Sequence, residues 1–458
     1  MHTNRGLRRL QQHQVGTRAR SVQAYDFFNL LTGPELLDRV EQQLPTHRER
    51  VYPPTETLSL FMTQTLSADG SCQAAVNRHS VERMVNGLPP CSTATGAYCK
   101  ARQRLPLTMI QSLVRQTGEL MAASAPTPWR WQGRTVKLLD GTTVTLPDTS
   151  ANQEDYPQQS NQKPGLGFPI ARVVGLLCMA TGAVLDAAIG PYSGKAGSEH
   201  ALLREMLDSI CAQDVIVADC YYCAYFLIAL LSARGADVLF QQHQRRITDF
   251  RRGHRLGSKD HVVVWHKPVK RPDWLSPSLY DSLPQTQLIR EVRVKSKVLV
   301  TTMLSTEHAS RKALGDLYAR RWDIELDLRN IKTTLGLEVL HCKTPQMSEK
   351  ELWSGLLAYN LIRLLMTQSA KRAQILPRQI SFKHTVQIWL AWSHYGPPDT
   401  QRIDGLLALI AQQRVGQRPG RVEPRALKRR ARPFPLLTIP RAQARAKILR
   451  HGHPKKLK

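Results

Sequence analysis

The sequence is poor in acidic residues and in aromatic residues. Only 36 of its 458 residues are Asp or Glu, against 64 Lys or Arg, and aromatic residues make up 6%. The shortage of acids leaves a formal net charge of +28. A surplus of this size favours binding to a polyanion, because each Lys or Arg that pairs with a phosphate releases a counterion. Nucleic acid is therefore the expected partner.

The chain also lacks an apolar run long enough to cross a membrane. One of the longest, VVGLLCMATGAVL from Val173, falls short of the roughly 20 residues that a spanning helix needs and contains Gly182. The eight Cys are scattered, and no signal peptide is recognisable. We expect a reduced, soluble and cytoplasmic protein without a membrane partner.

The positive charge is concentrated towards the two ends. Residues 1–20 contain five Arg and no acid, and residues 414–458 contain fifteen Lys or Arg with Glu423 as the single acid. Such ends either contact a nucleic-acid backbone or are merely solvated. Charge alone leaves both alternatives open.

Periodicity divides the chain into five parts. Apolar residues three or four apart predict a helical DNA-binding region with a basic leader over 1–125. Short β runs alternating with helices predict an α/β fold with a mixed sheet, which begins over 130–242. A β-rich insertion over 243–305 is followed by core helices over 306–375 and a basic region over 376–458.

The segment DLYARRWDIELDLRNIKTTLGL predicts part of one long helix, roughly 310–335. At about 100° per residue, one stripe about 60° wide carries Tyr318, Arg321, Glu325 and Lys332. Asp327 is expected to point to the opposite side. Ion pairing on the helix surface accounts for such a stripe as well as a functional site does.

The stripe resembles the YREK signature of the bacterial insertion-sequence transposases of family four. This family is a branch of the DDE transposases, which have an RNase H-like catalytic core. Two further motifs occur in the family's order: LLDGTTVTLPD around Asp140 resembles the first DDE aspartate, and VIVADCYYCAYF around Asp219 resembles the second. The β insertion also precedes the glutamate, as in that family. The resemblance implies an RNase H-like mixed sheet flanked by helices.

The resemblance also implies a function. The protein would be a DNA transposase that binds the terminal inverted repeats of its insertion sequence, cleaves them and joins them to target DNA, as a homodimer in the synaptic complex. Asp140, Asp219 and Glu325 would be the catalytic residues and the ligands of two Mg²⁺ ions, which Mn²⁺ can replace. Independently, in-line displacement at a phosphodiester calls for two divalent ions about 4 Å apart, held by hard oxygen ligands.

DNA contacts near the cut are implied for Tyr318, Arg321 and Lys332, which would hold the phosphates of the transposon end. Their chemistry allows this, because Arg grips a phosphate with two donors, Lys adds a point charge and Tyr adds a phenolic donor. Candidates for stacking on a DNA base are Trp265, Trp274 and Trp322. For Trp265 and Trp274, packing under the residue's own hairpin is an equally good alternative.

Several alternatives remain for these motifs. Asp140 before Gly141 fits a hairpin turn, and Asp219 fits a helix cap. The Cys220-x-x-Cys223 spacing is that of a redox pair or half a zinc site, but no second pair accompanies it. Four His between 243 and 266 lack tight ligand spacing. Two other functions stay open: an RNase H-like nuclease without strand transfer, and a DNA-binding protein that has lost activity.

Overall fold

The computed structural model describes residue 44 and residues 51–67, 69–85, 87–392, 400–416 and 437–452. The basic leader over 1–20 and much of the basic segment over 414–458 lie outside the described residues. Within the described ranges, no helix is both long and apolar enough to cross a membrane.

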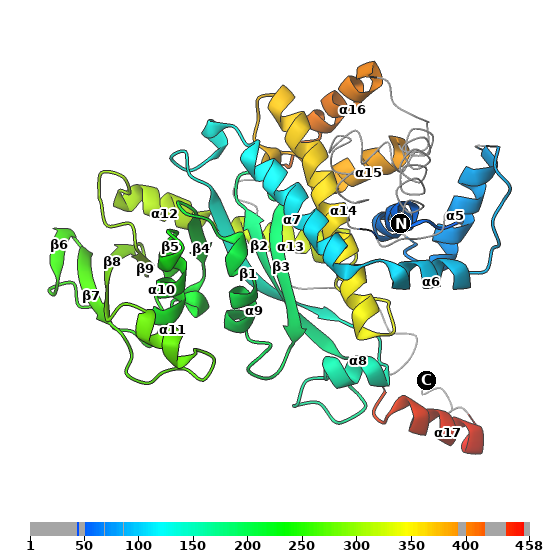
Figure 1. The fold of residues 1–458 in the computed structure, drawn as a ribbon, viewed down its shortest axis with the longest axis horizontal. Helices are drawn as coiled ribbons and strands as arrows, with labels where there is room; N and C mark the ends of the chain where they lie inside the picture. The colour runs from blue at the N-terminus through cyan, green and yellow to red at the C-terminus, as the bar shows by residue number, and fades with distance from the viewer. Residues whose placement is uncertain are drawn as a thin grey trace, which may run out of the picture.

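Nine strands form one mixed sheet in the order β3-β2-β1-β4-β5-β9-β8-β7-β6 (Figure 1). In chain order they are β1 (Val136–Thr145), β2 (Ile170–Cys178), β3 (Val184–Pro191), β4 (Val215–Ala218), β5 (Asp237–Gln241), β6 (His254–Gly257), β7 (Asp260–His266), β8 (Thr286–Val294) and β9 (Lys297–Thr301). β1 is antiparallel to β2 and parallel to β4, and β4 is parallel to β5. This arrangement confirms the RNase H-like mixed sheet.

The strands expected in the β-rich insertion extend the core sheet and do not form a sheet of their own. β9 pairs antiparallel with β5, and β8, β7 and β6 follow in turn towards the edge. The short helix α11 (Pro277–Ser282) lies between β7 and β8 in the chain. The insertion therefore shares its hydrogen bonding with the core, and its domain limits at 243 and 305 stay predictions.

Helices cover both faces of the sheet. Those that matter for the site are α4 (Pro54–Leu66), α5 (Cys72–Val85), α6 (Gly96–Arg104), α7 (Leu107–Ala123), α9 (Glu199–Glu205), α10 (Tyr225–Ala233), α12 (Arg311–Ala319), α13 (Trp322–Arg329) and α14 (Pro345–Arg372). The others are α8 (Ser150–Asp155), α15 (Phe382–Trp392), α16 (Thr400–Gln412) and α17 (Arg441–His451). Successive side chains of a strand point to opposite faces. Leu138 accordingly packs in the hydrophobic cluster that includes α7, α13 and α14, whereas Leu139 packs with α9 and α10.

The N-terminal helices pack directly on the core. In Figure 1, α7 and α14 run side by side, and α7 also contacts β3 while α4 contacts α14. Phe61 and Met62 of α4 belong to the same hydrophobic cluster as the sheet residue Leu138. The described part of the helical region, from residue 51 on, is thus continuous with the core in packing, and the limits 1–125 of this region as a domain stay a prediction.

Candidate active site

Two aspartates lie side by side on neighbouring parallel strands. Asp140 lies in the middle of β1, opposite Gly175 of β2, so the hairpin-turn alternative is wrong for it. Asp219 directly follows Ala218, the last residue of β4. The parallel register pairs Leu138 with Val217, and continuing it by two residues brings Asp140 level with Asp219. The sheet therefore brings together two carboxylates 79 residues apart in the chain.

Asp219 also begins the turn that follows it. Its Oδ1 accepts a hydrogen bond of 2.8 Å from the amide of Tyr221, which starts the 3₁₀ turn Cys220–Tyr222. The capping interpretation is thus correct, and it occupies one carboxylate oxygen. The neighbouring thiols are free, and burial raises the pKa of Cys223 to about 12 and also raises that of Cys220. Protonated thiols of this kind are poor nucleophiles and poor metal ligands.

The prediction of one continuous helix over 310–335 is wrong. α12 ends at Ala319, α13 begins at Trp322, and a π-helical turn spans Asn330–Thr334. At the break, the backbone amides of Arg320 and Arg321 donate hydrogen bonds to the carbonyls of Leu317 and Tyr318. These acceptors lie three residues earlier in the chain, as in a 3₁₀-helix, and not four as in an α-helix, so the backbone is tighter here. The four residues of the stripe therefore come from three consecutive elements.

Arg321 links the first aspartate to the glutamate. It lies at the N-cap of α13, and its Nη1 is 3.7 Å from Asp140 Oδ2. Its Nη2 donates a hydrogen bond of 2.9 Å to Oε1 of Glu325, one turn along the same helix. The Arg321 side chain is 11% exposed and that of Glu325 39%. The guanidinium thus neutralises two carboxylates at the edge of the sheet.

A fourth carboxylate, Glu199, reaches this cluster from α9. A Cβ on Gly141 would lie 2.5 Å from the Glu199 carboxyl, so glycine is what allows the close approach. The hydroxyl of the buried Tyr222 donates a hydrogen bond of 2.9 Å to Glu199 Oε2. No local pattern pointed to Glu199, because SEHALLREMLDSI is typical of any amphipathic helix.

Burial and like charge make Asp140 a weak acid. Burial is the main cause that raises its pKa to about 6, and the charges of Asp219 and Glu199 raise the pKa further. The hydrogen bond from the Gly141 amide and the charge of Arg321 oppose this by lowering the pKa. Crowded carboxylates of this kind favour either a proton or a cation between them. Their hard oxygens fit Mg²⁺ or Mn²⁺ as ligands.

The present side-chain positions do not form a closed metal cage. In the described part of the chain, no three His, Cys, Asp or Glu side chains are close enough to hold one ion together. Glu325 connects to Asp140 only through Arg321. The four His between 243 and 266 belong to no such set among the described residues either.

Tyr318 and Lys332 lie on either side of Glu325 in the chain. Tyr318 is largely buried; its hydroxyl donates to Gln241 Oε1 at 3.4 Å, and Lys297 Nζ lies 5.4 Å from its ring centre. Lys332 Nζ is 3.8 Å from Glu338 Oε1. The Glu338 carbonyl accepts from the amide of Thr145, so Lys332 is tied to the end of β1.

A basic pocket of about 590 Å³ adjoins Tyr318. It is lined by Lys295, Lys297, Arg311, Lys312, Tyr318 and Trp322, among others. Trp322 is 59% exposed and remains a candidate for stacking. Trp265 is instead 3% exposed and donates to Glu291 Oε1 at 3.0 Å, which excludes it as a free stacking surface. Trp274 is 38% exposed, with the Arg204 guanidinium 4.1 Å from its ring centre.

The helix that carries Glu325 is anchored by a buried ionic network. Asp327 is fully buried, so the expectation that it points away from the core is wrong. It pairs with Arg363 of α14 and, at 2.7 Å, with Arg378 of the 3₁₀ turn Pro377–Gln379. Arg378 also donates to the carbonyls of Cys178, Met179 and Asp323. Helical periodicity did not predict the burial of Asp327, because its partners Arg363 and Arg378 lie on other elements.

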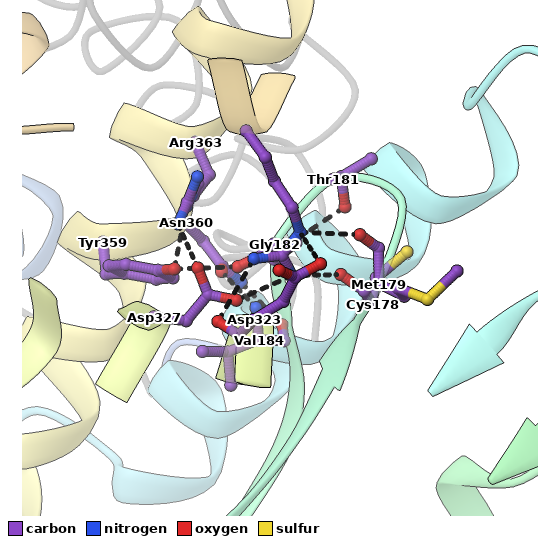
Figure 2. Close-up of polar contacts among 12 residues, drawn as sticks. Cys178, Met179, Thr181, Gly182, Val184, Asp323, Asp327, Tyr359, Asn360 and Arg363 are labelled. Atoms are coloured by element: carbon purple, nitrogen blue, oxygen red, sulfur yellow. Dashed lines mark hydrogen bonds and ion pairs between the residues drawn. The ribbon is translucent and has the colours of Figure 1, made fainter. Parts of the chain in front are cut away.

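Tyr359 and Gly182 complete the network (Figure 2). The Tyr359 hydroxyl accepts from Arg363 Nε and donates to the Gly182 carbonyl in the turn between β2 and β3. The Asn360 side chain accepts a hydrogen bond from the amide of Val184 and donates one to its carbonyl. It also donates to the carbonyl of Val114 and the hydroxyl of Thr117, both on α7. α13, α14, α7 and the β2–β3 turn are therefore fixed relative to one another.

Gly182→Ala is expected to lower the free energy of unfolding by about 2 kcal/mol, because alanine is strained at positive φ and cannot avoid the nearby cation. Gly182 has φ +75°, and an added Cβ would lie 2.8 Å from Arg363 Cζ. Gly336→Ala is the matched control, since Gly336 has φ +76° and open space around it. Urea denaturation of both variants checks this: equal losses would contradict a steric role for Arg363.

The geometry agrees with comparisons to known proteins. The family described as "Transposase DDE domain" matches residues 131–361, which include Asp140, Asp219 and Glu325. This chain belongs to the DDE transposases. It is 29% identical over 360 residues to the transposase InsG for insertion sequence element IS4 of Escherichia coli (strain K12), covering 77% of this chain and 79% of that protein.

A shorter match points the same way. The transposase for insertion sequence element IS421 of Escherichia coli is 30% identical over 92 residues, which covers 18% of this chain and 25% of that protein. The chain is thus an enzyme of the transposase class, and the RNase H-like sheet described above is the fold expected for it.

Proposed function

We propose that this transposase binds the terminal inverted repeats of its insertion sequence, nicks the transferred strand to leave a 3′-OH, and joins that end to target DNA. The observation that carries the proposal is the pairing of Asp140 and Asp219 on neighbouring parallel strands, with Glu325 linked to Asp140 through Arg321. Carboxylates converging from separate elements on one edge of a sheet are what two-metal phosphodiester chemistry needs.

The three carboxylates would hold two Mg²⁺ ions, or Mn²⁺ in their place. The ions, when bound, would neutralise charge on the attacking and leaving oxygens. Asp140 of β1 and Asp219, which directly follows β4, would bind one ion together. Glu325 is 39% exposed on α13 and would contribute once Arg321 releases it. Glu199 adds negative charge behind Asp140 and is positioned by Tyr222.

The phosphates of the transposon end would be held by the basic residues around this edge. Arg321 has two terminal nitrogens directed at carboxylates, and the same fork fits a phosphate. Tyr318 and Lys332 flank it, and the cations of the 590 Å³ pocket extend the positive surface. Joining two transposon ends requires two active sites, so we infer a homodimer in the synaptic complex.

An end-cleavage assay tests this function. A labelled inverted-repeat duplex from the flanks of the reading frame is incubated with the full-length enzyme and Mg²⁺ or Mn²⁺, with a target plasmid present. Nicking followed by joining supports the proposal, whereas nicking alone supports a nuclease without strand transfer. Binding without cleavage in either metal would indicate an inactive DNA-binding protein.

Arg321→Lys is expected to slow end cleavage about 10- to 100-fold, because a hydrogen bond to a charged group contributes about 1.5–3 kcal/mol and lysine cannot supply the second donor. Single-turnover cleavage with saturating enzyme measures the rate. The control is Arg234→Lys, since Arg234 also pairs with an aspartate but lies at the end of α10. An unchanged rate for the Arg321 variant would remove this residue from the phosphate contacts.

A further inference from the structure

Arg102 of α6 is buried and, in the part of the chain that the structure describes, has no carboxylate partner. Its side chain is 6% exposed, and within the described residues it forms no ion pair with Asp or Glu. Its Nη2 contacts the sulfurs of Cys72 at 3.1 Å and Cys99 at 3.7 Å, while its Nε is buried without a hydrogen-bond acceptor. Arginine stays charged in proteins, so a full positive charge is buried here.

Aromatic rings and thiols do not supply the missing negative charge. The guanidinium carbon lies 4.7 Å from the ring centre of Phe61 and 5.0 Å from that of Tyr98. Burial raises the pKa of the Cys72 thiol against the opposing effect of Arg102, which favours the neutral form of this thiol. An isolated buried charge is costly unless an anion accompanies it.

Arg102 lines a pocket that is large enough for such an anion. The pocket has a volume of about 650 Å³ and lies between the N-terminal helices and the segment just before α14. Besides Arg102, the residues that line it include Ser71, Lys343 and Thr344. Hydroxyl, ammonium and guanidinium donors are groups that bind phosphate oxygens.

The acids in the same pocket are already engaged. Glu351 accepts hydrogen bonds from the amides of His341 and Cys342 and pairs with the His341 ring at 3.1 Å. Asp69 accepts from the amide of Ser71 at 3.0 Å. Within the described residues, neither of these carboxylates pairs with Arg102.

A metal ion is a poor occupant of this pocket. Cys72, Cys99 and Cys342 all line it, but no set of three such ligands close enough for one ion occurs in the described residues. A guanidinium in contact with two of the sulfurs would also repel a cation. The electrostatics therefore select an anion.

We propose that this pocket binds a phosphate group, with Arg102 as its main ligand and Lys343 at its rim. The phosphate can be free inorganic phosphate or a phosphodiester of bound DNA, since both present the same oxygens. The site is separate from the carboxylate cluster. Binding of free phosphate would not depend on the proposed function. A bound phosphate would join α6 to the core across the pocket.

Calorimetric titration of the full-length protein with inorganic phosphate, in a phosphate-free buffer, tests the site. We expect saturable binding that weakens at least about tenfold in Arg102→Met, a neutral side chain that still packs on the rings. Arg104→Met removes the same charge from an exposed position of α6 and should leave binding unchanged. If Arg102→Met does not fold, Lys343→Met provides the same comparison.

DNA binding distinguishes the two sources. If the occupant is a DNA phosphodiester, an inverted-repeat duplex displaces phosphate and Arg102→Met lowers duplex affinity. If it is free phosphate, duplex and phosphate bind together and the variant keeps its duplex affinity. The proposal is overturned if wild-type protein binds no phosphate and duplex affinity is unchanged in Arg102→Met. It is equally overturned if alkylation kinetics show Cys72 to be a thiolate at neutral pH, since the thiolate would then be the counter-ion.

Discussion

Asp140→Asn, Asp219→Asn and Glu325→Gln, made singly, are expected to slow end cleavage and strand joining by at least about 10³-fold, because each removes a charged oxygen ligand from the metal-binding edge. The substitutions keep size and shape, so folding and binding of the inverted-repeat duplex should persist. Cleavage of a labelled end under single-turnover conditions gives the rate, and a gel-shift titration gives the affinity.

A remote carboxylate provides the control for these variants. Asp281 lies exposed on α11, and Asp281→Asn should cleave at the wild-type rate. A metal-binding readout separates catalysis from structure: Mn²⁺ binding followed by electron paramagnetic resonance should weaken in the three site variants and not in the control. If any of the three cleaves normally, that residue is not a ligand.

Asp327→Asn is expected to lower the free energy of unfolding by about 3–5 kcal/mol, because it leaves the buried Arg363 without its counter-charge and leaves Arg378 with the more distant Asp323, at 3.6 Å. Arg363 is 3% exposed, and Arg378 pairs with the same carboxylate. The second expected effect is on catalysis, since α13 carries Glu325 and this network fixes α13 on the core. Urea denaturation measures the first effect, and single-turnover cleavage at a temperature where the variant is folded measures the second.

Asp260→Asn is the matched control for this network. Asp260 and Arg290 form an equally buried pair in the insertion, where Arg290 donates to both carboxylate oxygens at 2.8 and 2.6 Å. Both variants should lose stability, but only Asp327→Asn should lose cleavage. A similar loss of cleavage in both would mean that general destabilisation, and not the placement of α13, is responsible.

Local patterns were sufficient for most elements of the fold. The alternation in VKLLDGTTVT and the apolar run VIVA predicted strands, and PTETLSLFMTQTL matches α4 over its full length. These segments are predictable because strand and helix periods are properties of neighbouring residues. The single helix over 310–335 failed because the bonds at Arg320 and Arg321 that tighten its break depend on how the two halves pack.

The site was predictable in its members but not in its arrangement. Motif spacing named Asp140, Asp219 and Glu325, and their catalytic role stays a prediction. Nothing local indicated that Arg321 bridges two of them or that Glu199 approaches through Gly141. Each of these facts depends on residues brought together from distant parts of the chain.

The sequence by itself determined the α/β class, the basic character and the order of the three acidic motifs, because composition and periodicity are written into the chain. Only the tertiary structure decided which charges are buried and what neutralises them. Asp327 has a surface position by helical period, yet it is buried between two arginines from α14 and the turn beyond it. Burial and pairing arise from contacts across the sheet and between helices, and they set the free-energy cost of every charge in this protein.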